Sequence, residues 1–166
     1  ITAVTGLLYT IPSLAAFAVL RPIFGLEIWT AVIPLTTYTL LILYVNTIAG
    51  LRSVPPDVNE AADGMGYRGW TRFWRVQLPL AVPLIMSGIR VAAVTTIGLV
   101  TVASLIGGDR FGGLGQFITE GLDVRFDTKI YVGAVGSVFL AFVVDALLVG
   151  LQRLLTPWTR VRAAKG

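Results

Sequence analysis

Four long apolar runs constrain this chain more than any other feature of its sequence. They cover about Ile1–Leu20, Ile28–Ile48, Leu80–Ile106 and Ile130–Leu151. A helix rises about 1.5 Å per residue and needs about 20 residues to cross a hydrocarbon core roughly 30 Å thick. Each run reaches that length, so we predict an all-α integral membrane protein with four spans visible. Because Ile1 lies inside an apolar run, we expect a further N-terminal span to precede it.

The composition agrees with a membrane protein and excludes several kinds of active site. Only 13% of the residues are charged, whereas a soluble domain carries about 25%. The chain has no cysteine and no histidine, which excludes disulfides, zinc sites built on these residues and Ser-His or Cys-His nucleophiles. We therefore predict no catalytic residue, no metal site and no cofactor bound by this chain.

The basic residues are concentrated on one side of the predicted spans. The 49–79 loop and the segment after Leu151 contain eight, and the opposite side contains four. The eight are Arg52, Arg68, Arg72, Arg75, Arg153, Arg160, Arg162 and Lys165; the four are Arg21, Arg110, Arg125 and Lys129. The positive-inside rule places the long loop and the C-terminus in the cytoplasm. Basic residues that flank apolar runs indicate membrane orientation rather than nucleic-acid binding.

The long loop has a helical pattern of its own. Proline ends the preceding span, and the spacing of Asp57 and Glu60 predicts an N-cap with a capping box for a short helix through Asp63. Gly64 and Gly66 are expected to break that helix.

The second half of the loop is amphipathic. Trp70, Phe73 and Trp74 follow helical spacing beside arginines, which predicts an interfacial helix over Trp70–Val76 at the level of the lipid headgroups. The Leu78-Pro79 pair is then expected to begin the next span. On this pattern alone the loop could be a hairpin that only ties two spans together.

The same loop resembles the signature loop of ABC importer permeases. Glu60-Ala61-Ala62 is followed after three residues by Gly66 and after nine more by Val76-Gln77-Leu78-Pro79, with valine where that family has isoleucine. Further similarity points to the osmoprotectant branch, whose substrates are of the glycine betaine, choline, carnitine or proline type. It is carried by Thr10–Ala15, Gly88–Arg90, Ala103–Gly108 and Gly112–Gly115, with Asp109-Arg110-Phe111 lengthening the glycine-rich loop.

This resemblance implies a type I importer fold, a helical bundle similar to a methionine permease, over residues 1–157. Residues 53–79 would form the coupling loop and 158–166 a basic cytoplasmic tail. The chain would be the permease subunit of a binding-protein-dependent importer in the bacterial plasma membrane. It would move a small osmoprotectant inward by ATP-driven alternating access and would not itself be an enzyme.

The resemblance also implies partners and contact residues. The coupling residues would be Glu60, Ala61, Ala62, Gly66, Val76, Leu78 and Pro79, with the alanines allowing close approach and Gly66 setting a bend. Because the chain has no Walker-type phosphate loop, ATP and Mg²⁺ would bind a separate ATPase subunit. The other expected partners are a second permease copy or paralogue, an extracytoplasmic binding protein and membrane lipid, but no nucleic acid.

Two charged residues lie inside the predicted spans. Arg90 and Asp145 fall at similar depth in antiparallel helices, so we predict an ion pair between them. A direct transport role, or an arginine that snorkels to the interface, remains an alternative. Gly133, Ser137 and Ala141 precede Asp145 at intervals of four, a stripe of small residues that favours close helix packing.

The second span is unusually polar. Its threonines and tyrosines predict either a pathway lining, with candidates Pro12, Ser13, Thr37 and Tyr44, or hydroxyls that bond back to their own helix. Pro12 and Pro34 would mark kinks. In the Gly107–Lys129 loop, Leu114–Ile118 is expected to form a short helix that covers the outer mouth of the pathway.

Two other functions stay open on the sequence alone. One is an ion-coupled secondary transporter, a class that tends to show inverted repeats and broken helices. The other is a non-transporting membrane assembly subunit whose loop docks a cytoplasmic protein.

Overall fold

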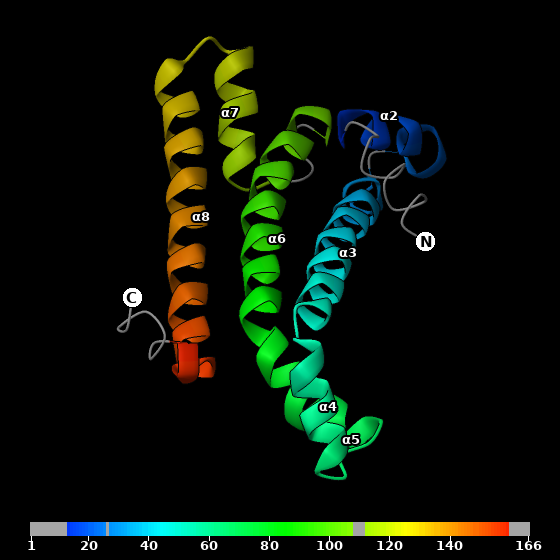
Figure 1. Cartoon of the computed structure of the whole chain (residues 1–166). Coiled ribbons are helices and arrows are strands. Elements are labelled where there is room, and N and C mark those ends of the chain that lie inside the picture. The colour runs from blue at the N-terminus through cyan, green and yellow to red at the C-terminus, as the bar shows by residue number, and fades with distance from the viewer. Residues whose placement is uncertain (1–12, 26, 108–111, 160–166) are drawn as a thin grey trace. The chain divides into compact units, whose positions relative to one another are not determined.

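The computed structural model describes residues 13–25, 27–107 and 112–159, and these residues are helical over most of their length (Figure 1). The helices in chain order are α2 (Ser13–Phe24), α3 (Trp29–Arg52), α4 (Pro56–Gly64), α5 (Trp70–Arg72), the π-helix η1 (Phe73–Gln77), α6 (Leu78–Gly107), α7 (Leu114–Asp123), α8 (Asp127–Leu155) and the 3₁₀-helix η3 (Pro157–Thr159).

Three of the described helices are long and apolar enough to cross a membrane. They are Trp29–Arg52, Trp70–Ser104 and Asp127–Leu155. They confirm the second, third and fourth predicted spans. Of the first predicted span, residues 1–12 lie outside the described part of the chain, and the remainder begins α2.

Helix α2 continues past the end of the first apolar run at Leu20, through Arg21 and Pro22 to Phe24. A proline this close to the C-terminal end removes one helix hydrogen bond, which does not stop the last turn from forming. The helix ends at Gly25, whose φ of +66° is easy only for glycine and whose N–H donates to the Arg21 carbonyl at 2.8 Å.

The chain divides into two compact units, and each long helix contributes to both. The first unit comprises the described residues of Ile1–Leu41 and Ala92–Asp145. Phe17, Ala31 and Ala103 form its buried apolar cluster. Hydroxyl contacts join its helices, from Thr39 to Thr96 at 2.8 Å and from Thr101 to Ser137 at 3.3 Å.

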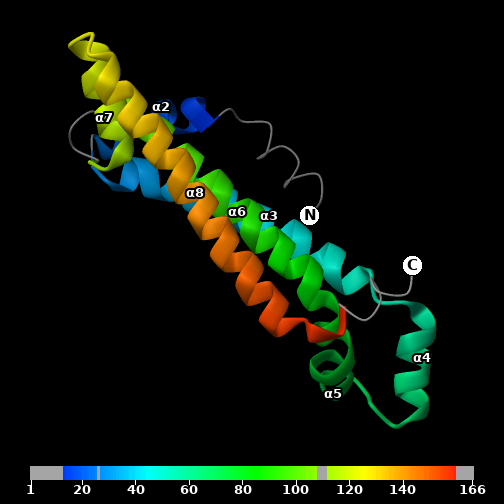
Figure 2. The ribbon, with the colours of Figure 1, turned by 90° about the vertical axis from the view of Figure 1, so that its left-hand side faces the viewer.

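Glycines bring α7 into close contact with its neighbours in this unit. A Cβ on Gly115 would lie 2.4 Å from the Ser104 Oγ of α6, and one on Gly133 of α8 would lie 2.6 Å from the Leu114 carbonyl oxygen. Gly133 and Ser137 are buried, which confirms close packing at this end of the small-residue stripe. The predicted short helix is present but longer than expected, and Figures 1 and 2 show it beside the first turns of α8.

An ion pair closes the turn between α7 and α8. The Lys129 ammonium donates to one Glu120 carboxylate oxygen at 2.7 Å, and the Gln116 amide donates to the other at 2.7 Å. The hydrogen bond from Lys129 and then that from Gln116 lower the pKa of Glu120 below its usual value. The carboxylate form is therefore favoured in the folded chain.

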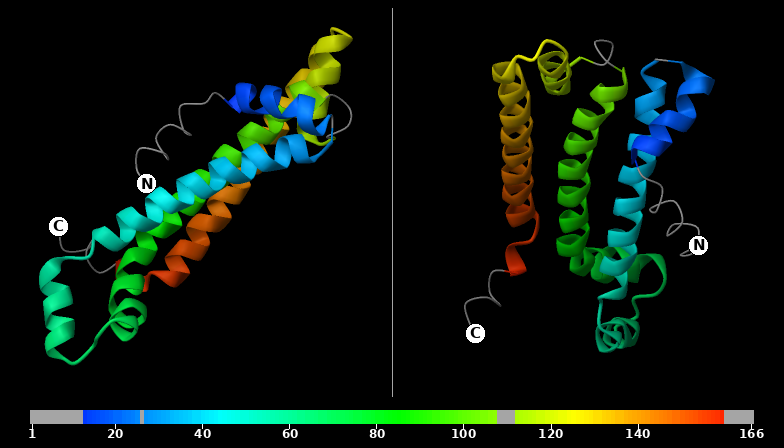
Figure 3. Two further views of the ribbon diagram at one scale, coloured as in Figure 1. Left: turned by 90° about the vertical axis from the view of Figure 1, so that its right-hand side faces the viewer. Right: turned by 90° about the horizontal axis from the view of Figure 1, so that it is seen from above.

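The second unit comprises the described residues of Ile42–Val91 and Ala146–Gly166. Its helices α3 and α6 meet at Gly88, where an added Cβ would lie 2.3 Å from the Cβ of Asn46. The Gln152 amide of α8 donates to the Pro83 carbonyl of α6 at 3.4 Å. The polar hairpin of α4 and α5 joins α3 to α6 in this unit (Figure 3).

We predict that Gly88→Ala lowers the free energy of unfolding by about 1–3 kcal/mol, because the new methyl overlaps the Asn46 side chain near its backbone. Thermal unfolding of the detergent-solubilised chain measures the loss. The matched control is Gly98→Ala on the same helix, where an added Cβ meets open space and alanine favours the helix. Equal losses in both variants would contradict the close contact.

We also predict that Glu120→Gln lowers stability at neutral pH and that the difference from the parent chain disappears in acid. A depressed pKa adds stability above the ordinary value, which is 4.5, and this contribution is lost as pH falls through the lowered value. Thermal unfolding from about pH 7 down to about pH 3 checks the sign. Glu60→Gln, a change at an exposed position on α4, controls for net charge. A difference that grew towards acid pH would refute the pairing.

Candidate functional site

The candidate site is the polar hairpin over residues 53–77, which follows α3 directly. Ser53 ends α3 by donating its N–H to the Ala49 carbonyl at 3.0 Å and its hydroxyl to the Gly50 carbonyl at 2.7 Å. Val54 is then buried, and Pro55 carries the chain into α4 in an extended conformation. The chain thus changes direction after α3 through hydrogen bonds between residues three or four apart in the sequence.

The predicted N-cap at Asp57 is wrong. Helix α4 begins at Pro56 and its N-cap is Pro55, with no side-chain capping bond. The φ of proline is pre-set for the first helical position, where an N–H would have no partner within the helix, so α4 begins earlier than the capping-box spacing predicts. Asp57 still lies in the first turn, where a negative charge is favourable, and Glu60 is exposed.

Gly66 makes the bend between the two arms of the hairpin, as predicted. Its φ is +84°, and the N–H of Tyr67 donates to the Ala62 carbonyl at 3.0 Å, which closes the end of α4. Gly64 is the last helical residue and does not break α4. Apart from Gly66 itself and its two chain neighbours, no residue comes within 4 Å of a Cβ built on Gly66, so its backbone conformation, and not space, requires glycine.

Helix α6 begins at Leu78, as predicted, but no break separates it from the second arm. Helix α5, η1 and α6 form one helical stretch, and Pro79 lies inside it. A proline ring presses on the carbonyl four residues earlier, here that of Arg75, which belongs to the wider π-helical turn. The wide turn therefore accommodates Pro79 without ending the helix.

The three aromatic residues of this arm pack on one another, as their spacing predicts. The ring centroids lie 5.6 Å apart for Trp70 and Phe73, 5.5 Å for Trp70 and Trp74, and 5.4 Å for Phe73 and Trp74. Trp70 is 73% exposed and presents an aromatic surface.

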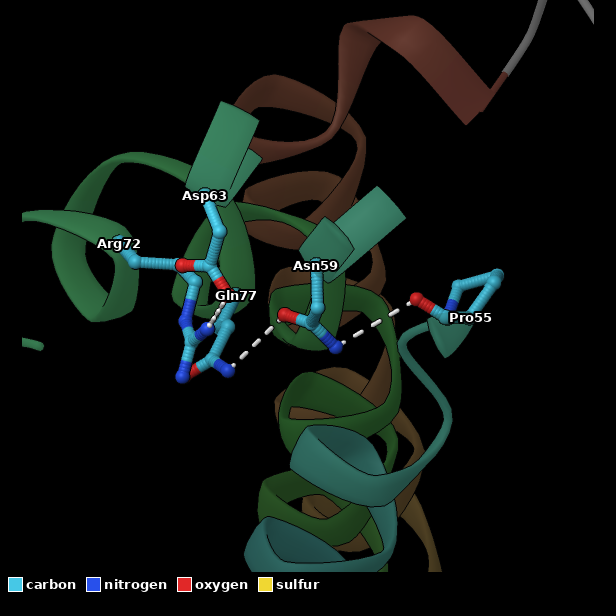
Figure 4. A network of polar contacts seen from close by, with 5 residues as sticks. All are labelled: Pro55, Asn59, Asp63, Arg72 and Gln77. Carbon is cyan, nitrogen blue, oxygen red and sulfur yellow. Dashed lines mark hydrogen bonds and ion pairs between the residues drawn. The ribbon is translucent and has the colours of Figure 1, made fainter. Parts of the chain in front are cut away.

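Two polar contacts hold the arms together (Figure 4). Arg72 pairs with Asp63 at 2.5 Å, and the Gln77 amide donates to the Asn59 Oδ1 at 3.0 Å. Asn59 also donates to the Pro55 carbonyl at 3.4 Å. Sequence reasoning missed Asn59, Asp63 and Gln77, although the spacing of four residues between the first two indicates a shared face of α4.

The packing divides the predicted coupling residues into two groups. Glu60 and Ala61 are exposed on α4, whereas Ala62 is only 1% exposed. Helix α4 contacts both α5 and η1, so the small Ala62 side chain serves packing within the hairpin. Val76, Leu78 and Pro79 are half-buried in the second arm. The outward face thus consists of Glu60, Ala61 and their exposed neighbours.

The predicted residues within the spans are placed as follows. Arg90 on α6 and Asp145 on α8 are half-buried, and their pairing stays a prediction. Thr37 is exposed and donates to the Ile33 carbonyl of its own helix at 2.9 Å, as the alternative for these threonines expects. Tyr44 is exposed on α3. Pro12 lies outside the described residues, as does the side chain of Ser13.

Comparison with known proteins matches residues 1–161 to the family described as binding-protein-dependent transport system inner membrane components. The glycine betaine/carnitine/choline transport system permease protein OpuCB of Bacillus subtilis is 38% identical over 152 residues, 92% of this chain and 69% of the relative.

Two further relatives show comparable similarity. The osmoprotectant import permease protein OsmW of Salmonella typhimurium is 39% identical over 156 residues, which is 91% of this chain and 71% of the relative. The carnitine transport permease protein OpuCB of Listeria monocytogenes is 38% identical over 166 residues, which is all of this chain and 75% of the relative. With its membrane-length helices and its signature hairpin, this chain belongs to the family of binding-protein-dependent transport system inner membrane components, the permease subunits with the type I ABC importer fold.

Proposed function

We propose that this permease subunit imports small osmoprotectants that carry a quaternary ammonium group. The observation that carries the proposal is the similarity, over nine tenths of the chain or more, to permeases named for glycine betaine, carnitine and choline. These three compounds share a trimethylammonium group on a short polar skeleton, so a pathway suited to that group would serve all of them.

The hairpin is the proposed contact with a separate ATPase subunit. Exposed Glu60 and Ala61 offer a charged group and a small side chain on one face of α4. The Arg72–Asp63 pair and the Gln77–Asn59 bond tie that face to the arm that continues into α6. A displacement of α4 by the ATPase subunit would therefore be transmitted through these two contacts to a membrane-length helix.

The excess of basic residues on the hairpin side supports a cytoplasmic location for the hairpin and the C-terminus. The same topology would leave α7 and the turn before α8 outside, towards an extracytoplasmic binding protein. A second permease copy or a paralogue would complete the membrane part. Residues 158–166 would form a basic tail beyond the permease domain of residues 1–157.

Reconstitution of the complete importer in proteoliposomes tests the function. We expect uptake of labelled glycine betaine or choline that requires both ATP and the binding protein. Uptake that follows an ion gradient without ATP would favour a secondary transporter, and no uptake of either compound would favour an assembly role. A vesicle with an inactive ATPase subunit is the matched control.

We predict that Gly66→Val uncouples ATP hydrolysis from uptake while membrane insertion is unchanged. A β-branched residue at φ +84° carries a strain of about 1–3 kcal/mol, which the bend can relieve only by changing shape. The control is Gly66→Asn, because asparagine tolerates left-handed backbone, and it should retain most uptake. Normal ATP-driven uptake by the valine variant would count against coupling through this bend.

A further inference from the structure

The turn that joins the hairpin to α6 is π-helical. It covers Phe73–Gln77, and at its end the N–H of Leu78 donates to the Phe73 carbonyl, five residues earlier. Such a bond brings residues five apart onto one face of the helix, whereas in an α-helix residues four apart share a face. π-Helical turns are rare and often lie at functional sites, so we looked for the contacts that hold this one.

Contacts with α4 require the π-helical form. Arg72 and Gln77 lie five residues apart, and both bind α4 (Figure 4): Arg72 pairs with Asp63, and the Gln77 amide donates to the Asn59 Oδ1 at 3.0 Å. Asn59 and Asp63 lie four residues apart on an α-helix and therefore share a face. A regular α-helix would place Arg72 and Gln77 about 140° apart around its axis, so the two bonds could not form together.

The two bonds that hold the π-helical turn are of modest strength. The side chains of Arg72 and Asp63 are 29% and 47% exposed, and solvent weakens an ion pair this open. The other bond joins two neutral amides. The Nε of Arg72 is buried and has no hydrogen-bond partner in the described part of the chain, which disfavours this arrangement. A small displacement of α4 is therefore enough to release the turn.

We propose that η1 is a switch between the hairpin and α6, an inference that rests on the proposed function. While α4 lies against the second arm, the turn is π-helical. When the ATPase subunit displaces α4, the bonds to Asn59 and Asp63 break and the turn becomes α-helical. The arm before the turn and α6 then rotate against each other by about 100° around the helix axis. A displacement of α4 is thus converted into rotation of a membrane-length helix.

Two exposed positions on either side of the turn can report its state. Thr71 precedes η1 and Leu80 follows it. Over nine residues an α-helix turns by about 900°, which puts these positions on opposite sides of the axis, whereas the extra residue of the π-helical turn leaves them about 80° apart. Spin labels on Thr71→Cys and Leu80→Cys therefore lie several ångström farther apart in the α-helical form. The chain has no cysteine of its own, so labelling is specific.

The matched variants are Asn59→Leu and Asn59→Asp in the doubly labelled chain, within the complete importer and with cysteine-free partner subunits. Leucine is close to asparagine in size but offers no acceptor to the Gln77 amide, whereas aspartate keeps the acceptor. The distance between the labels is measured without nucleotide and with ATP bound to a hydrolysis-deficient ATPase subunit. Glycine betaine uptake per ATP hydrolysed is measured in the unlabelled, hydrolysis-competent importer.

We expect the parent chain and Asn59→Asp to show the short distance without nucleotide and the long distance with ATP. Asn59→Leu should show the long distance in both conditions and several-fold less uptake per ATP hydrolysed. Gln77→Leu removes the same bond from the other side and should behave in the same way. It keeps the test readable if Asn59→Leu does not assemble.

Two results would overturn the switch: the short distance without nucleotide in the leucine variants, or an unchanged distance in the parent chain when ATP binds. The second would make the bond between Gln77 and Asn59 a purely structural contact. ATP-driven uptake with an unchanged distance would refute the switch alone. A change of distance on ATP binding in an importer that takes up neither glycine betaine nor choline would support the switch and refute the proposed substrates.

Discussion

Lipid offers a peptide group no hydrogen-bond partner, and that constraint underlies the structure. The chain meets it with long, uninterrupted helices, even across prolines. Pro34 lies inside α3 and Pro83 inside α6, and both helices continue past them. In the described parts of the chain, the backbone turns sharply outside the long helices, at glycines such as Gly25 and Gly66 and at Arg125 with φ +52°.

Burial of apolar surface does not drive helices together in lipid. Association of the helices depends instead on close packing at small residues and on hydrogen bonds between polar side chains. Gly88 and Gly133 remove side chains where helices touch, and hydroxyl pairs such as Thr39 with Thr96 supply polar contacts. These hydroxyls have two functions, since several also satisfy carbonyls of their own helix.

The sequence predicted the features that depend on residue type and on the period of apolar residues. It did not predict the exact start of a helix or contacts between residues far apart in the chain. The length of the apolar runs predicted the second, third and fourth spans. Glycine's conformational freedom predicted the bend at Gly66, and helical spacing predicted that the aromatic residues around Trp70 share one face. The Asp57 cap failed because Pro56 begins the helix first. Helix α6 does begin at Leu78, but no local pattern predicted that η1 would join it to α5 without a break. The bond between Gln77 and Asn59 joins residues 18 apart, which no local pattern encodes.

The π-helical turn at Phe73–Gln77 has a consequence for orientation. Relative to an ordinary α-helix, one widened turn holds an extra residue and so offsets everything before it by about 100° around the axis. Trp70 and Arg72 therefore point in a different direction from the one they would have in a regular α-helix continuous with α6. Conversion of this turn to a regular α-helical turn would leave the helix continuous. It would rotate Trp70 and Arg72 about the helix axis relative to α6, and Arg72 would then point away from Asp63.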